Sequence, residues 1–235
     1  MARKPRRLSS AGSQTTRTSL KERAYRELKA LIQTGEMTSE SALSERLLSE
    51  RLGMSKTPIR AALENLETQG LVTVSPQRGI LVRDLSARDI AELFDVRSAV
   101  EPFVAGQLAR GALTPDQRER VRTNLSRQHR AATIGDALES TRLDIAFHRL
   151  LAALHDNREL MFWLERCFDR LHRSVLRVNR LARNRLLKSY QEHEGIADAV
   201  LGGRSDQAAR LMKEHLGFGR QFLLVGGAPS GGNGE

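Results

Sequence analysis

The chain has 235 residues and a formal net charge of +10 at pH 7, which points towards a polyanionic partner such as nucleic acid. Its single cysteine excludes an internal disulfide and a cysteine-based zinc finger. No signal-peptide pattern and no apolar stretch of about 18 residues is present, so we expect no membrane partner and a cytoplasmic location. Cys167 is expected to be a buried, unreactive thiol.

Both ends of the chain are predicted to form tails. Residues 1–18 carry five basic side chains and no acid, and such a segment cannot bury a core. We predict a disordered basic tail that either follows DNA phosphates or only adds solubility. Up to Asp84 the chain has 15 Lys and Arg against 9 Asp and Glu, whereas the remainder has 23 against 19. Residues 224–235 are rich in glycine and are predicted to form a flexible tail.

Residues 19–84 contain a helix–turn–helix pattern followed by two short strand patterns. A helix pattern from Ser44 to Leu52 runs into Gly53, and a second helix is predicted to open at Ser55. Two β-like runs follow at 71–74 and 80–82, joined by a basic turn at 75–79. Together these elements predict a winged helix-turn-helix domain that binds double-stranded DNA.

The start of the second helix carries groups that a DNA-contacting helix needs. Ser55 is expected to cap this helix, and Pro58 suits a first turn where a missing N–H costs nothing. Four polar side chains can contact phosphates or guanine edges. They are Lys56, Thr57 and Arg60 of this helix and Arg46 of the preceding one. An inward stripe is predicted at Ile59, Leu63 and Leu66. The alternative is a helical hairpin with a purely structural role.

The stretch from Leu20 to Arg83 resembles the N-terminal domain of the GntR family of bacterial transcription regulators. The matching motifs are Leu43-Ser44-Glu45, the run Leu52-Gly53-Met54-Ser55-Lys56-Thr57-Pro58-Ile59-Arg60, Gly70-Leu71-Val72 and Arg78-Gly79. The resemblance implies that Arg46, Lys56, Thr57 and Arg60 contact DNA and that Arg78-Gly79 is the wing tip. The chain departs from the family at Ala61, where Glu is usual, and at Ser39-Glu40, where Pro-Gly is usual. Neither departure removes a DNA-facing group.

From residue 85 to 223 the strand signals stop and helical periodicity takes over. Helices are predicted near 86–110, 115–133, 136–155, 158–180, 186–202 and 205–222. Capping patterns at the helix starts are Ser86 with Asp89 and Thr114 with Gln117, and the expected stops are Gly111 and Gly202-Gly203. Six helices with short connections predict an antiparallel all-helical bundle, which makes the chain mainly α.

Four polar residues of this bundle lie on or beside apolar stripes. Asp144 and His148 are four residues apart on one helix face, and His193 and His215 lie on the stripes of two further helices. Inward-facing histidines and a carboxylate find a partner readily in a divalent cation. A lone histidine on an apolar stripe, however, is more often a hydrogen-bonded core or interface residue than a metal ligand. The remaining histidines, to which we assign no role, are His129, His155 and His172.

Residues 85–222 are similar to the helical effector-binding domain of the FadR subfamily within the GntR regulators. The matching pieces are Leu93-Phe94-Asp95-Val96-Arg97 with Glu101-Pro102, Asp144-Ile145-Ala146-Phe147-His148, Glu192-His193 with Ile196, and Met212 with His215-Leu216. The resemblance implies that Asp144, His148, His193 and His215 hold a divalent cation, with zinc as first choice and nickel or manganese as alternatives.

Two roles are possible for Arg97. By itself it forms an i to i+4 pair with Glu101, worth only about 0.2–0.5 kcal/mol. The family resemblance implies instead that it binds the carboxylate of an effector over the metal, and two-pronged donation suits that group. Arg170 is a second candidate for the same anion. Three histidines and one aspartate leave up to two positions open on an octahedral ion, which suits a ligand cradle.

These expectations combine into a ligand-responsive transcription regulator, more often a repressor in this subfamily, and not an enzyme. A homodimer would place two winged helices on the half-sites of an operator, and a small carboxylic acid would control operator affinity. One alternative is a metal-responsive regulator without an organic effector. A more distant one is a metal-dependent hydrolase, against which stands the absence of a His-Glu-x-x-His motif and of a nucleophile elbow.

Overall fold

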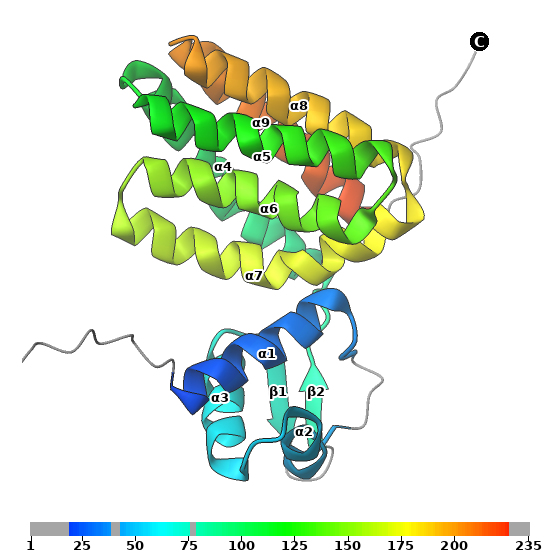
Figure 1. Ribbon diagram of the computed structural model, residues 1–235. Helices are drawn as coiled ribbons and strands as arrows, with labels where there is room; N and C mark the ends of the chain where they lie inside the picture. Colours follow the sequence, from blue (N-terminus) through cyan, green and yellow to red (C-terminus); the bar gives the residue numbers. More distant parts are fainter. Residues whose placement is uncertain (1–18, 39–42, 76–78, 226–235) are drawn as a thin grey trace, which may run out of the picture.

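The computed structural model describes residues 19–38, 43–75 and 79–225. Within these ranges the chain forms a small N-terminal domain and a larger helical bundle (Figure 1). The predicted mainly α class is thereby confirmed. The tail at 1–18, nearly all of the tail at 224–235, and Ser39, Glu40 and Arg78 lie outside the described residues. In the described ranges, no helix is both long and apolar enough to span a membrane.

The N-terminal domain consists of three helices and a two-stranded antiparallel hairpin. The elements are α1 (Leu20–Thr34), α2 (Glu45–Leu52), α3 (Lys56–Thr68), β1 (Val72–Ser75) and β2 (Gly79–Val82). The predicted stripe of Ile59, Leu63 and Leu66 is confirmed, since all three are buried with Leu28 and Ile80 in one apolar cluster. This cluster holds α3 against α1 and leaves the polar start of α3 outside.

The helical bundle is built from six helices whose ends follow the local sequence signals. They are α4 (Ala87–Arg110), α5 (Pro115–Thr133), α6 (Ala137–Leu154), α7 (Arg158–Leu181), α8 (Asn184–Leu201) and α9 (Ser205–Leu224). The capping boxes predicted at Ser86 and Thr114 are both present. The last helix continues to Leu224, one residue into the predicted tail, because Leu223 is buried in the bundle core.

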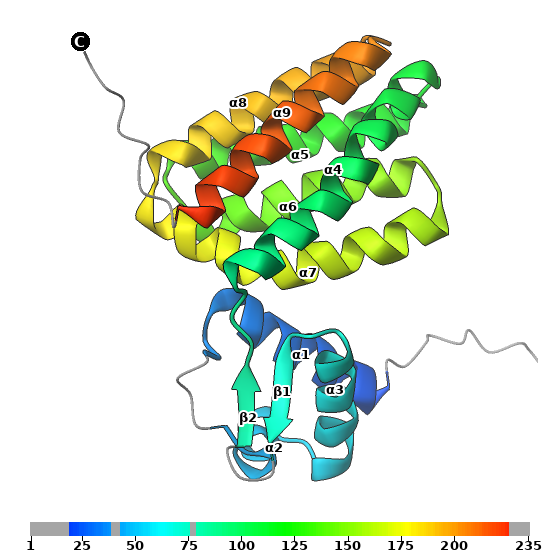
Figure 2. The same ribbon diagram turned by 180° about the vertical axis from the view of Figure 1, so that it is seen from behind.

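The packing of the bundle places α6 between α5 and α7, with α4, α8 and α9 on the other side (Figures 1 and 2). Its core is one large apolar cluster that includes Phe94, Phe147 and Met212. Cys167 is buried in this cluster as predicted, and burial raises the pKa of its thiol to about 11. A thiol with such a pKa is inert at neutral pH.

The two domains meet where α1 lies against α7, as both views show (Figures 1 and 2). Nζ of Lys29 lies 2.5 Å from Oδ2 of Asp169, and the amide of Gln33 donates to the same carboxylate over 3.5 Å. Further along the junction, Arg180 donates to the main-chain oxygen of Thr34. These contacts are polar and the two domains have separate apolar clusters, so the junction resembles a surface interface more than a shared core.

Candidate functional site

The predicted DNA-contacting side chains lie at the end of the molecule farthest from the bundle. Figures 1 and 2 show α2 and the start of α3 at this end, together with the Ser75–Gly79 end of the hairpin. The predicted residues that are solvent-exposed there are Arg46, Ser55, Lys56, Thr57 and Arg60. A helix start with exposed basic side chains is a suitable surface for DNA phosphates.

Both arginines of this set, Arg46 and Arg60, pair with neighbouring carboxylates. Arg60 makes a two-pronged contact with Glu45 of α2, with N···O distances of 3.0 and 2.8 Å. The hydrogen bond from Arg60 is the largest influence on Glu45 and lowers the pKa of its carboxyl. Arg46 pairs with Glu50 at 2.7 Å. Because both guanidinium groups are exposed, these pairs orient them at little energetic cost and leave them accessible to phosphate.

The prediction that the side chain of Ser55 caps α3 is wrong. Ser55 occupies the cap position with extended backbone, but its hydroxyl accepts no hydrogen bond from the helix. A capping oxygen normally accepts from the second or third amide of the helix. The third residue here is Pro58, which has no N–H to donate.

Gly79 stands where only glycine fits. Its φ is +75°, and a Cβ placed on it would lie 2.4 Å from the main-chain oxygen of Leu43. This close approach accompanies a β-bridge between Leu43 and Ile80, which ties the hairpin to the segment before α2. Gly79 therefore fixes the position of the hairpin, whereas Arg78 lies outside the described residues.

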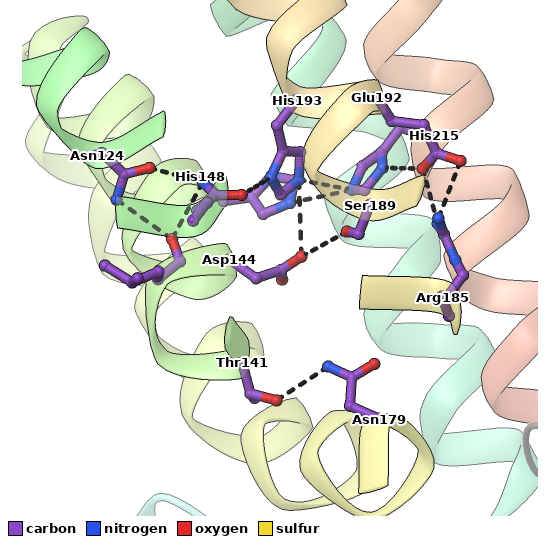
Figure 3. Close-up of polar contacts among 12 residues, drawn as sticks. Asn124, Thr141, Asp144, His148, Asn179, Arg185, Ser189, Glu192, His193 and His215 are labelled. Atoms are coloured by element: carbon purple, nitrogen blue, oxygen red, sulfur yellow. Dashed lines mark hydrogen bonds and ion pairs between the residues drawn. The ribbon is translucent and has the colours of Figure 1, made fainter. Parts of the chain in front are cut away.

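The four predicted metal ligands come together in the helical bundle. Asp144 and His148 project from α6, His193 from α8 and His215 from α9, and one ligand atom from each lies within 4.8 Å of the others. Figure 3 shows the three imidazole rings pointing towards one another above Asp144. Nε2 of His215 lies 3.2 Å from Nε2 of both His193 and His148. Oδ1 of Asp144 lies 3.7 Å from Nε2 of His193.

Each histidine has an acceptor for its other ring nitrogen. Nδ1 of His193 lies 2.8 Å from the side-chain oxygen of Gln128. Nδ1 of His215 lies 2.8 Å from Oε2 of Glu192, and Nδ1 of His148 lies 2.5 Å from Oε2 of Glu101. These acceptors keep the proton on Nδ1, so the three Nε2 atoms face one another as lone pairs.

This arrangement has the chemistry of a metal site. Lone pairs facing one another at 3.2 Å repel unless a cation lies between them. Two nitrogens bound to one ion at about 2.0–2.1 Å would lie about 2.9–3.4 Å apart, depending on the coordination angle. The observed spacing is in that range. Burial also lowers the pKa of His215, and lowers that of His193 well below its usual value, so both imidazoles are neutral donors at pH 7.

A small cavity opens beside the cluster, with a volume of about 50 Å³. Its polar lining includes Asp144, His148, His215, Arg97 and Arg185, and its apolar lining includes Phe94, Val175, Val178, Phe222 and Leu223. Such a mixture of polar and apolar groups suits a small organic ligand. The open side of the metal cluster and a buried guanidinium thus face the same space.

Arg97 forms the ion pair expected with Glu101 and also lines the cavity. Nε of Arg97 lies 2.5 Å from Oε1 of Glu101, but both side chains are buried, so the pair is not the weak surface contact expected. Burial alone would raise the pKa of Glu101, yet Arg97 and His148 outweigh it and lower the pKa to about 2. Glu101 therefore joins an arginine of the cavity lining to a histidine of the cluster.

The sequence-based reading of Arg170 needs correction. Arg170 is absent from the lining of the cavity and lies at the domain junction, where it pairs with Asp89 at 2.8 Å and approaches Gly70. Helical spacing turns this part of α7 towards α1 and the start of α4. The cavity receives a different second arginine, Arg185 of α8.

Several residues of the site were missed. Arg185 makes a two-pronged contact with Glu192 at 3.1 and 2.7 Å, and Glu192 in turn accepts from His215. Gln128 supports His193 from 65 positions away in the chain. The only local signal was that Glu192 directly precedes His193. The three histidines without an assigned role lie apart from the ligand set: His129 is exposed, His155 caps the end of α6, and His172 is buried near the junction.

Two domain families match the chain. Residues 20–82 match the family described as bacterial regulatory proteins, gntR family, and residues 92–218 match the FCD domain. The chain belongs to the GntR family of bacterial regulators, with an FCD domain as its helical part. It is therefore a DNA-binding transcription regulator.

Similar proteins agree with this assignment. The HTH-type transcriptional repressor GlaR of Escherichia coli is 29% identical over 203 residues, which cover 82% of this chain and 90% of GlaR. A transcriptional regulator from an unstable DNA locus of Streptomyces ambofaciens, itself uncharacterized, is 31% identical over 82% of this chain and 80% of its own length. Among solved structures, E. coli McbR/YncC has a TM-score of 0.79 at 20% identity, covering 88% and 98% of the two chains, which supports the fold. The two sequence relatives are described as a transcriptional repressor and a transcriptional regulator, and neither is described as an enzyme.

Proposed function

We propose that this regulator belongs to the FadR subfamily and represses its target operon until a small carboxylic acid binds in the helical domain. In this proposal a divalent cation occupies the cluster of Asp144, His148, His193 and His215, with zinc as first choice and nickel or manganese as alternatives. The observation that carries it is the convergence of three Nε2 atoms, each from a histidine whose Nδ1 has an acceptor.

The acid is proposed to bind between the ion and Arg97. The ion would supply a Lewis acid with open positions, which polarises and orients a carboxylate. Glu101 engages Nε of Arg97 at 2.5 Å and one terminal nitrogen at 3.5 Å, which leaves the other terminal nitrogen for a carboxylate in the cavity. The apolar side chains of Val175, Val178 and Phe222 would cover the carbon skeleton.

A chain of contacts leads from the cavity to the DNA-binding domain. The guanidinium carbons of Arg97 and Arg149 lie 5.4 and 5.8 Å from the ring centroid of Phe168. The next residue, Asp169, is within 3.4 Å of Arg149 and binds Lys29 of α1. An acid that binds one arrangement of Arg97 better than another would shift the docking of α1 on α7, and with it the spacing of two DNA-binding domains in a homodimer.

The experiment is substitution of His193, which is fully buried at the centre of the cluster. His193→Ala should abolish uptake of zinc, measured by elemental analysis after removal of free metal, while binding of operator DNA by the metal-free protein remains measurable. His155→Ala, outside the cluster, is the matched control. Stoichiometric metal in His193→Ala would refute the metal site. Failure of a panel of carboxylic acids to release the operator from metal-loaded protein would refute the effector.

A further inference from the structure

Two buried Arg–Glu–His triads flank the proposed metal position. In one, Nε of Arg97 and Nδ1 of His148 each lie 2.5 Å from a carboxylate oxygen of Glu101. In the other, Arg185 contacts Glu192 and Glu192 accepts from His215. The third histidine, His193, has the neutral acceptor Gln128. Both arginines line the same cavity, so the two triads present paired charges to a common space.

The net charge of this cluster is important because most of its charged side chains are shielded from water. Arg97, Glu101 and Arg185 are less than a tenth exposed, and Glu192 has a side chain 23% exposed. Each Arg–Glu pair is neutral by itself, and Asp144 contributes one further negative charge. With neutral histidines the cluster therefore carries a net charge of −1. A divalent cation would change that to +1, which leaves one positive charge in a poorly solvated cavity.

We propose that the metal-loaded cavity selects acids with a single negative charge, and that Glu101 and Glu192 set this selectivity by neutralising Arg97 and Arg185. The inference rests on the function proposed above and specifies the ligand class of the same site. A singly charged acid would bring the cluster to neutrality, whereas a dianion would leave an uncompensated charge. The two guanidiniums therefore do not act as binding sites for two carboxylates, although both face the cavity.

The phenylalanines around Arg185 support this role. Its guanidinium carbon lies 4.2 Å from the ring centroid of Phe218 and 5.9 Å from that of Phe222. Stacking on one side and Glu192 on the other hold the group in a fixed position.

The test compares two acids of the same shape and different charge. Full-length protein saturated with zinc is titrated by calorimetry with succinamate, a monoanion, and with succinate at a pH where it carries both charges. We expect succinamate to bind at least about tenfold more tightly, and the metal-free protein to bind neither acid. The ratio of the two affinities is informative because general changes in the pocket affect both acids alike.

Variants that remove a carboxylate charge test whether the ratio of the affinities for succinamate and succinate depends on the charge of the cluster. Glu192→Gln leaves Arg185 unpaired and should move the ratio at least about tenfold towards succinate. Glu101→Gln makes the same change of charge on the opposite side and should move it in the same direction. Glu194→Gln, an exposed neighbour on α8, should leave it unchanged. Zinc uptake by each variant, measured first, shows that the site is intact.

The outcomes separate the two proposals. If zinc does not bind to the wild-type protein, the proposed function fails. If zinc binds but succinate is preferred, if neither acid binds, or if both Glu variants keep the wild-type ratio of affinities, the charge selectivity is overturned while the metal site stands.

Discussion

Nζ of Lys29 in the DNA-binding domain lies 2.5 Å from Oδ2 of Asp169 in the helical domain. The two residues are 140 positions apart, and their contact joins α1 to α7. Burial of Asp169 raises the pKa of its carboxyl more than Lys29 and Arg149 lower it. The pair therefore adds little net stability, and its effect is on how the two domains are oriented.

Asp169→Asn should loosen the docking of the domains while changing the free energy of unfolding by less than about 1 kcal/mol. The measurement is a distance distribution between spin labels at the exposed positions Glu22 and Ser98, which should become broader. Asp95→Asn, which removes an exposed ion pair within the helical domain, is the control. A distribution as narrow as that of the wild type would show that Asp169 does not orient the domains.

His172 should make the stability of the protein sensitive to mild acid. It is buried close to the main chain of Gln33 in α1, and burial lowers the pKa of its imidazole to about 4. The unfolded chain takes up the proton near pH 6.5, whereas the folded chain does so only near pH 4. Protonation of His172 therefore favours the unfolded state, and the free energy of unfolding falls as the pH drops from 6.5 towards 4. Between pH 7 and 5 the loss is about 2 kcal/mol.

Urea unfolding of zinc-saturated protein at the two pH values measures this loss. His172→Gln should remove about 2 kcal/mol of the pH dependence, whereas His129→Gln, at an exposed position, should not change it. If the free energy of unfolding of His172→Gln depends on pH as that of the wild type does, the imidazole titrates normally in the folded protein.

Arg60→Ala should weaken operator binding by about 1–3 kcal/mol, the scale of one good base contact. The loss should be smaller on unrelated DNA, because phosphate contacts by other residues persist. Arg88 is a matched control, since it is exposed and paired with a glutamate at 2.8 Å but lies on α4. Band shifts on operator and unrelated fragments provide the comparison, and equal affinity of Arg60→Ala for the operator would place the recognition surface elsewhere.

Gly79→Ala should displace the hairpin, because its new Cβ would meet the oxygen of Leu43 at 2.4 Å. Gly53→Ala is the control for backbone strain alone, since Gly53 also has positive φ but has nothing within 4 Å of a Cβ. The control should lose about 1–2 kcal/mol of stability, and Gly79→Ala should lose more and also bind operator more weakly. Equal losses in the two variants would show that the hairpin accommodates the methyl group.

Gln128→Leu should weaken zinc binding by about 10–100-fold, because Nδ1 of His193 loses the acceptor that fixes its proton. Competition with a chromophoric chelator gives the affinity, and Gln191→Leu, at an exposed position on α8, is the control. An unchanged affinity would mean that His193 keeps its orientation through packing against Phe147 alone.

Much of the fold was readable from the sequence because its signals are local. A cap such as Ser86 with Asp89 depends on residues three positions apart, and the stripe of Ile59, Leu63 and Leu66 depends on the period of one helix. The same locality explains the failed cap at Ser55, because Pro58, which suits the first turn, stands at the third helical position and has no N–H for the Ser55 hydroxyl to accept from.

Local sequence patterns were enough to predict the helices and the winged domain, and the family resemblance pointed to the four residues of the proposed metal cluster. The packing of the helices was needed to show which side chains support that cluster, which arginine lines the cavity and where the two domains meet. Gln128 reaches His193, and Lys29 reaches Asp169, across 65 and 140 positions. Such contacts depend on how separate helices pack and rotate against one another, which places Arg170 of α7 at the domain junction and Arg185 of α8 in the cavity lining.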